Sequence, residues 1–240
     1  MALQCGIVGL PNVGKSTLFN CLSNAKAQAA NFPFCTIEPN VGVITVPDQR
    51  LIRLAEIDNP KRVVPTTIEI VDIAGLVKGA SKGEGLGNKF LSHIRECEAI
   101  VHVVRCFEDP DIIRHADSLN PQHDIETINL ELIAADRETV AKRAERAAKM
   151  LKSGEKRFAD EAALGEKLLA HLDNLQPART CPMTDKEREI ARDWFLLTTK
   201  PVIYACNIKE DDLGKDEDSL PGVADVKAIA AGENAKVLVI

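Results

Sequence analysis

Short apolar runs alternate with longer polar or amphipathic stretches along this chain of 240 residues. Six runs have the length and composition of buried strands. They lie near residues 4–8, 40–46, 66–72, 99–105, 202–206 and 236–240. Strands that alternate with helical stretches indicate an α/β fold, with a mostly parallel sheet and helices on both faces. The ligand site of such a sheet lies at the carboxyl ends of its strands.

The strand pattern is interrupted between residues 124 and 198. Apolar residues there recur at spacings of three and four, which predicts amphipathic helices. They are Ile125, Ile128, Leu132 and Ala135, then Ala144, Ala147 and Leu151, then Leu168, Leu172 and Leu175. Thr184 and Glu187 form a capping-box signature before a further helix. We therefore predict one domain formed by residues 1–123 and 199–240, and an inserted helical, coiled-coil-like arm over residues 124–198.

Composition and charge narrow the class of protein. The chain is 45% hydrophobic and 28% charged, which is typical of soluble globular proteins. Its net charge of −6 gives no general attraction to DNA or RNA, so a nucleic-acid partner would need a local basic face. A signal peptide is not predicted, because the start MALQCGIVGL lacks a charged region and a long apolar segment. A membrane span is not predicted, because no apolar stretch reaches about 18 residues. The seven cysteines are scattered without a C-x-x-C pair, which favours free thiols in a reducing compartment. We predict a cytoplasmic protein with no membrane partner and no specific DNA partner.

The most specific motif is GLPNVGKS, residues 9–16, which fits G-x-x-x-x-G-K-[ST]. It follows an apolar strand and precedes a predicted helix, the context in which backbone N–H groups and a helix N-terminus surround phosphates. We predict that Lys15 contacts the β- and γ-phosphates and acts in catalysis, and that Ser16 binds Mg²⁺. The nucleotide-binding residues predicted in this loop are Asn12, Val13, Gly14, Lys15, Ser16 and Thr17.

Two further segments fit the γ-phosphate side of the same site. Asp72 ends a strand and begins a D-x-x-G segment, so it is predicted to hold Mg²⁺ through water, with the Gly75 amide bonding the γ-phosphate. Thr36 lies in a loop bounded by prolines, where a switch threonine would close over Mg²⁺ and the γ-phosphate. The alternatives are a turn-forming aspartate and a loop threonine bonded to its own backbone. The order of the three segments is that of switch GTPases, which makes Thr36 and Gly75 candidate catalytic residues beside Lys15.

Base recognition is predicted in the segment after the strand at 202–206. Guanine-specific switches carry N-K-x-D at this place, whereas residues 207–210 read N-I-K-E. The lysine is displaced by one position and the final carboxylate is one methylene longer, so guanine is not expected to be favoured. The base-binding residues predicted here are Asn207, Ile208 and Glu210.

Together these strings resemble the YchF family, the Obg-like ATPases. The resemblance rests on GLPNVGKS, ANFPFCTIEPN, DIAGLVKGASKGEGLGN and the N-x-x-E segment, and it runs through all 240 residues. It implies a G-domain-like P-loop NTPase that prefers ATP to GTP, resides in the cytosol and associates with ribosomes. Members of the family usually continue into a C-terminal TGS domain, which is expected to be absent from this sequence.

The resemblance also bears on the attacking water. Ras-like switches carry a glutamine after D-x-x-G, but Leu76 stands there and cannot orient water, so slow intrinsic hydrolysis is expected. The family implies a histidine in the loop after HVVRCFE; here Arg114 takes that place and His115 follows. His115 is a candidate catalytic residue, with a solvated loop histidine as the alternative. Similarity to K⁺-dependent switches makes Asn12 a candidate for binding K⁺, with a turn-forming asparagine as the alternative.

A basic stretch stands out in this acidic chain. Residues Lys142–Arg157 hold seven Lys or Arg and two Glu. They form either a solvated helix face or a contact with the ribosome or ribosomal RNA, in which the cations neutralise phosphates.

These observations predict a nucleotide-hydrolysing molecular switch that binds ATP, and GTP more weakly, with Mg²⁺, and acts with the ribosome. A GTP-specific Obg-like switch is the first alternative. A P-loop phosphotransferase is the second, but it would need an acceptor pocket and an arginine-bearing lid, whereas the long segments here are a D-x-x-G loop and helical arms.

Overall fold

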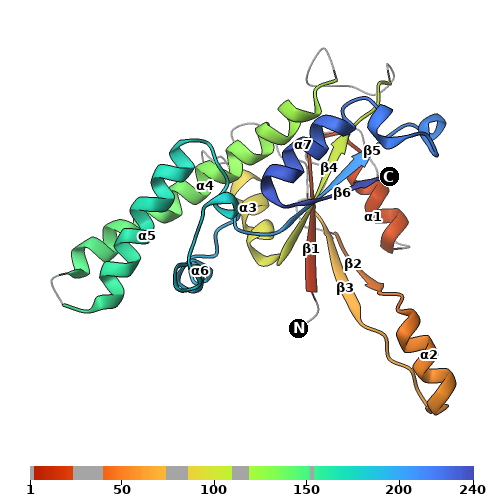
Figure 1. The fold of residues 1–240 in the computed structure, drawn as a ribbon, viewed down its shortest axis with the longest axis horizontal. Helices are drawn as coiled ribbons and strands as arrows, with labels where there is room; N and C mark the ends of the chain where they lie inside the picture. The colour runs from red at the N-terminus through yellow and green to blue at the C-terminus, as the bar shows by residue number, and fades with distance from the viewer. Residues whose placement is uncertain (1–2, 24–39, 74–85, 110–118, 152–153) are drawn as a thin grey trace.

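The computed structural model describes residues 3–23, 40–73, 86–109, 119–151 and 154–240. Six strands within these ranges form one sheet in the order β2-β3-β1-β4-β5-β6 (Figure 1). Their bounds are β1 Leu3–Val8, β2 Asn40–Thr45, β3 Thr67–Asp72, β4 Ala99–Arg105, β5 Val202–Asn207 and β6 Lys236–Val239. Every pair is parallel except β2 with β3. The predicted α/β class and the mostly parallel sheet are confirmed.

Helices cover both faces of the sheet. One face packs on α1 (Lys15–Ser23), whose Phe19 is buried with Ile7, Val103 and Ala205. The other face packs on α3 (Leu86–Glu96), α7 (Val223–Glu233) and the first part of α4 (Pro121–Met150). Strands covered on both faces lie in the interior, which explains why β1 and β4 are almost continuously apolar.

The predicted helical arm is formed by α4, α5 (Lys156–Asp173) and α6 (Asp185–Arg192). Figure 1 shows α4 and α5 lying along each other and extending away from the sheet. They approach closely where a Cβ on Gly165 would lie 2.6 Å from the Cβ of Ala144. A second hydrophobic core fills the arm and includes Leu164, Leu168 and Trp194. Because α4 contributes to both cores, it runs without a break from the sheet into the arm, and the domain boundary at residue 124 stays a prediction.

Capping side chains begin two of these helices, α4 and α6. The Asn120 side chain accepts from the His123 N–H at 3.0 Å before α4, which starts with a proline. Thr184 and Glu187 form the predicted capping box before α6. Among the described residues lie the short 3-10 helices η3 Ala178–Thr180, η4 Glu210–Asp212 and η5 Glu217–Ser219.

Helix α2 (Gln49–Asp58) is one of the helices to which the sequence analysis gave no residue range. It projects with the ends of β2 and β3 from the edge of the sheet, and none of its residues is buried. Its apolar residues Ile52, Leu54 and Ile57 are exposed, so they do not mark a face directed at a core.

Candidate nucleotide-binding site

The candidate site lies at the carboxyl ends of β1, β3 and β5. The loop between β1 and α1 carries the G-x-x-x-x-G-K-S motif, and Asp72 and Asn207 are the last residues of β3 and β5. In the sheet, β1 pairs with β3 on one side and is separated from β5 only by β4 on the other, and all these strands are parallel, so their carboxyl ends meet at one edge of the sheet.

Two glycines allow the loop to sit against the strands. Gly9 has a φ of +153°, and a Cβ there would lie 2.5 Å from the Val103 carbonyl oxygen of β4. Gly14 has a φ of +100°, and a Cβ there would lie 2.4 Å from Nδ2 of Asn207. Any other residue would clash at both places, so the glycines of the motif are required by packing as well as by backbone conformation.

Lys15 is buried at the start of α1, and its Nζ donates to the Leu10 carbonyl oxygen at 2.7 Å. Burial lowers the pKa of Lys15 to about 8, and the nearby Asp72 carboxylate partly opposes this shift. The ammonium group therefore remains mostly charged at pH 7. A buried cation that is held by a carbonyl of its own loop is suited to receive an anionic ligand in place of that carbonyl.

Ser16 and Asp72 form the side of the site predicted to bind a metal. The Ser16 hydroxyl donates to Oδ2 of Asp72 at 2.8 Å. Burial raises the pKa of Asp72, while the Ser16 hydroxyl and the Lys15 ammonium group act in the opposite direction. A hydroxyl and a carboxylate this close together present the oxygen donors that Mg²⁺ prefers, so the residues fit that ion.

Asn207 joins β5 to the phosphate loop. Its Nδ2 donates to the Val13 carbonyl oxygen at 3.0 Å. The next residue, Ile208, is buried, and its N–H donates to the Ile240 carbonyl oxygen at 3.0 Å. Glu210 is exposed at the beginning of η4. The structure thus brings Asn207 to the loop, whereas base contacts by Ile208 and Glu210 stay predictions.

Other predicted residues divide into two groups. Asn12 lies in the loop with a φ of +62°, and Thr17 is exposed on α1. The predicted catalytic residues Thr36, Gly75 and His115 lie outside the described residues, as do Leu76 and Arg114.

Sequence analysis missed Arg105, the last residue of β4. It is buried, and its guanidinium group donates to the carbonyl oxygens of Phe107 at 3.1 Å and Asp109 at 3.2 Å. The group also lies 4.5 Å from the centre of the Phe107 ring. Arg105 therefore fixes the segment that leaves β4 at the same edge of the sheet as the phosphate loop. A cation at the end of an apolar strand was the available signal.

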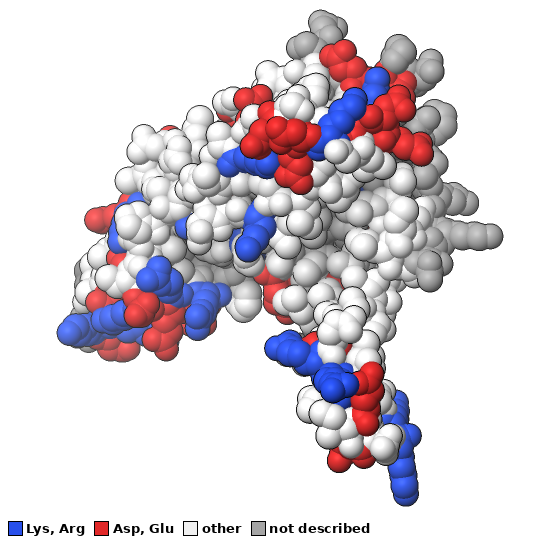
Figure 2. All heavy atoms as spheres, turned by 45° about the vertical axis from the view of Figure 1, so that its right-hand side comes forward, with Lys and Arg blue, Asp and Glu red and all other residues white. Residues whose placement is uncertain are grey.

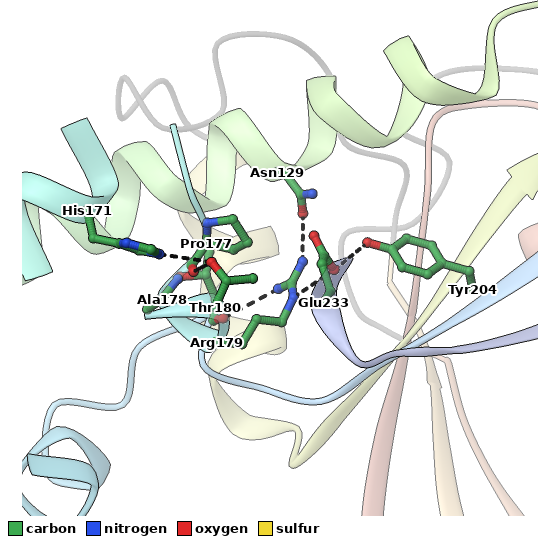
Figure 3. A network of polar contacts seen from close by, with 9 residues as sticks. Asn129, His171, Pro177, Ala178, Arg179, Thr180, Tyr204 and Glu233 are labelled. Carbon is green, nitrogen blue, oxygen red and sulfur yellow. Dashed lines mark hydrogen bonds and ion pairs between the residues drawn. The ribbon is translucent and has the colours of Figure 1, made fainter. Parts of the chain in front are cut away.

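A buried polar network holds β5 against the helices (Figure 3). The Arg179 guanidinium donates to Glu233 on α7 at 2.9 Å and to Asn129 on α4 at 3.2 Å. The Tyr204 hydroxyl on β5 donates to the same Glu233 carboxylate at 2.8 Å. Tyr204 and Asn207 belong to one strand, so the network fixes the strand whose end reaches the phosphate loop.

Three of the seven cations in the basic stretch Lys142–Arg157 form ion pairs within the arm. Lys142, Lys149 and Arg157 bind Glu138, Glu145 and Glu161 at 2.5, 2.5 and 2.6 Å. Acidic and basic side chains are accordingly interspersed over the end of the arm (Figure 2). The pairs of Lys142 and Lys149 are exposed on both sides and contribute little, so these two cations can exchange their partners.

Searches of known proteins identify relatives along the whole chain. A family model described as "50S ribosome-binding GTPase" matches residues 4–151. "Ribosome-binding ATPase YchF" of Bacillus subtilis (strain 168) is 52% identical over 240 residues, which cover 100% of this chain and 65% of that protein. The protein of the same name from Escherichia coli O157:H7 is 52% identical over 238 residues, covering 99% of this chain and 64% of its own length.

A solved structure has the same fold. The structure of the Schizosaccharomyces pombe YchF GTPase superposes with a TM-score of 0.79 at 37% identity, covering 99% of this chain and 65% of that one. This chain therefore spans about two thirds of the length of the relatives it matches. No helix in the described ranges is long and apolar enough to cross a membrane.

Proposed function

Since the chain belongs to the family of 50S ribosome-binding GTPases, as one of its YchF-like members, we propose that it is a nucleotide-hydrolysing molecular switch. It binds ATP, and GTP more weakly, together with Mg²⁺, and it acts with the ribosome in the cytoplasm. The recognition of the YchF family from sequence motifs is confirmed. The relatives are longer than this chain, which covers 65% of the Bacillus subtilis protein, so their activity is carried over to this chain as a proposal.

The observation that carries the proposal is the meeting of three side chains at one edge of the sheet. Lys15 is buried and charged beside Asp72, and Asp72 accepts from Ser16 at 2.8 Å. A cation and two oxygen donors in this arrangement suit a phosphate chain with its Mg²⁺ ion. Bound Mg²⁺ would neutralise charge on the phosphates, and Ser16 and Asp72 are the described residues that would hold it.

The preference for ATP is proposed from the base segment. Residues 207–210 read N-I-K-E rather than N-K-x-D, and Glu210 is exposed. The two bacterial relatives are named ATPases, which supports the same assignment, whereas the Schizosaccharomyces pombe relative is named a GTPase. A GTP-specific switch is the alternative, and titration with both nucleotides separates the two.

Hydrolysis without a partner is proposed to be slow, because Leu76 cannot orient water. His115 is the candidate residue of this chain for that role, and Thr36 and Gly75 are proposed to close on the γ-phosphate. Asn12, which adopts a left-handed backbone conformation in the loop, is proposed to help bind K⁺ near the phosphates.

Association with the ribosome is proposed to involve the helical arm. The relatives are named ribosome-binding, and the arm carries the basic stretch Lys142–Arg157. The exposed ion pairs within that stretch can be exchanged for contacts with RNA phosphates.

A titration with fluorescent ATP and GTP analogues, with and without Mg²⁺, tests the proposal. The chain is expected to bind both analogues, with ATP the tighter, and Lys15→Ala is expected to abolish binding while the fold remains intact. Lys149→Ala removes an exposed lysine of the arm and serves as the matched control. The γ-phosphate of ATP should be released as free inorganic phosphate and should not be transferred to an acceptor molecule. Unchanged affinity in a folded Lys15→Ala variant would contradict the assignment of the phosphate site.

A further inference from the structure

The segment between α6 and β5 presents one aromatic residue to solvent. Phe195 has a φ of +51°, a left-handed conformation that bulky residues rarely adopt, and it is 63% exposed. The residues on either side, Trp194 and Leu196, are buried. An exposed ring stabilises the fold little, while its backbone conformation carries strain, so folding alone does not explain a phenylalanine at this position.

Side chains from two helices fix this segment in place. Arg95 on α3 donates to the Phe195 carbonyl oxygen at 3.1 Å, and Arg143 on α4 donates to the Asp193 carbonyl oxygen at 3.1 Å. The buried carboxylate of Asp136, also on α4, accepts the Leu197 N–H at 2.8 Å and the neighbouring Thr198 N–H at 2.7 Å. The backbone that carries Phe195 is therefore held in a fixed position against α3 and α4.

Arg95 also lines a cavity of about 340 Å³ between α3 and α4. The lining residues are mostly polar: Leu91, Ser92, Arg95, Ala135, Glu138, Thr139 and Lys142. Two of them are cations, two carry hydroxyl groups and one is acidic. Lys142 binds Glu138 at 2.5 Å, but both side chains are exposed, so this pair contributes little and Lys142 can exchange its partner for a phosphate.

We propose that Phe195 and this cavity form a binding site for single-stranded RNA. Phe195 stacks on a base, and Arg95 and Lys142 bind the phosphates beside it. Aromatic rings next to cations recognise single-stranded RNA in this way, because every base has a face that can stack. A protein partner would favour an apolar pocket around the aromatic residue, whereas the lining here is polar and cationic.

This proposal rests on the proposed association with the ribosome and assigns that contact to a small part of the surface. Of the basic stretch, only Lys142 lines this site. Strain alone does not identify it, since Leu175 has a similar φ of +59° and is 61% exposed. Leu175 has no aromatic ring, which makes it a matched control for the exposed, left-handed Phe195.

Fluorescence anisotropy with a labelled twelve-nucleotide uridine RNA tests the proposal. Phe195→Ala is expected to weaken binding about tenfold, within the range measured for loss of one stacked base. Phe195→Tyr, which keeps the ring, should restore binding, and Leu175→Ala should bind as the unchanged chain does. Lys142→Gln should reduce the slope of log affinity against log salt by about 0.7, the value for one phosphate of a single strand. Lys149→Gln, on the same helix but outside the cavity, should leave the slope unchanged.

Circular dichroism confirms the fold of each variant, and titration with ATP is measured on the same samples. Failure of the unchanged chain to bind the RNA, or equal affinity in Phe195→Ala, would overturn the proposal. Weaker ribosome association in Phe195→Ala without any binding of the free RNA would overturn it in favour of a protein contact. If the unchanged chain does not bind ATP but the RNA affinities of the chain and its variants are as expected, the nucleotide switch is rejected and the RNA site is supported.

Discussion

The hydroxyl of Ser16 donates a hydrogen bond of 2.8 Å to the carboxylate of Asp72, although 56 residues separate them in the chain. The bond joins the first turn of α1 to the end of β3 and sets two oxygen donors side by side. A metal ion that binds here would find both donors already in place, which reduces the entropy lost on binding.

Ser16→Ala should therefore weaken nucleotide binding mainly when Mg²⁺ is present. We expect a loss of at least about tenfold in affinity for Mg²⁺–ATP and a smaller loss for ATP in excess chelator. Isothermal titration calorimetry in both conditions measures the difference. Ser23→Ala on the same helix, whose hydroxyl donates to the Phe19 carbonyl oxygen, is the control. Equal losses with and without Mg²⁺ would contradict the metal role.

The stability of the nucleotide-free chain should depend on Lys15 at alkaline pH. The pKa of Lys15 is about 8 in the folded chain and 10.5 when the residue is unperturbed. Between these values the unfolded chain binds a proton that the folded chain lacks, so this residue makes stability rise as pH increases from about 8 to about 10.5. The contribution is at most about 3 kcal/mol. Urea unfolding across this range should show a smaller rise for Lys15→Met than for the unchanged chain; identical curves would rule out the lowered pKa.

Breaking the buried pair of Arg179 and Glu233 should destabilise the fold strongly. Their side chains are 8% and 9% exposed, so Glu233→Gln leaves a buried guanidinium group without its counter-charge. We expect a loss of about 3 kcal/mol or more in the free energy of unfolding. Glu145→Gln, which breaks the exposed pair with Lys149, should cost less than about 1 kcal/mol. Similar losses in the free energy of unfolding in the two variants would show that burial of an ion pair does not determine its contribution to stability.

Gly165→Ala should destabilise the arm despite the helix propensity of alanine. The added Cβ would lie 2.6 Å from the Cβ of Ala144, and we expect a loss of about 1–3 kcal/mol from overpacking. In α7, a Cβ at Gly232 meets nothing within 4 Å, so Gly232→Ala should stabilise by up to about 1 kcal/mol. Thermal unfolding measures both. Adding Ala144→Gly to Gly165→Ala should restore part of the lost stability. If it does not, contact with Ala144 is not the cause of the loss.

ATP should bind about five- to a hundredfold more tightly than GTP. Guanine donors left without partners in a closed site cost about 1–3 kcal/mol, which corresponds to this range. Glu210→Asp should recover little GTP affinity, because Lys209 is also displaced by one position from its place in guanine-specific switches. Paired titrations of the unchanged chain and this variant measure both effects. Tighter binding of GTP would contradict the proposed preference for ATP but not the proposed nucleotide-hydrolysing switch.

Strong local signals made most of the fold predictable from sequence. The apolar runs of β1, β4 and β5 and the 3/4 spacing in α4 and α5 reflect burial, which leaves a pattern in any sequence. Helix α2 was given no residue range although Leu51, Leu54 and Ala55 stand at spacings of three and four, and its apolar side chains Ile52, Leu54 and Ile57 are exposed rather than directed at a core. Its capping residues Asp48 and Asn59 were further local signals.

The site was predictable in part for a related reason. Lys15, Ser16 and Asp72 belong to motifs whose spacing is fixed by contact with phosphate and metal. The residues Arg179, Glu233 and Tyr204 belong to no motif, since their network joins distant parts of the chain. Arg105 bonds locally, to Phe107 and Asp109, but its string HVVRCFE served in the sequence analysis only to locate the loop that follows. Only the folded structure reveals such contacts.

The hydrogen bond from Asn207 to the Val13 carbonyl oxygen has a consequence for synthesis of the chain. Its two residues are 194 positions apart, so the phosphate loop is made early and completed late. At about 5–20 residues per second, roughly 10–40 s pass before the second partner is made. During that interval the β5 side of the pocket is missing and its strand neighbour β4 has an open edge. The nascent chain therefore acquires a complete nucleotide pocket only after the whole arm has been synthesised.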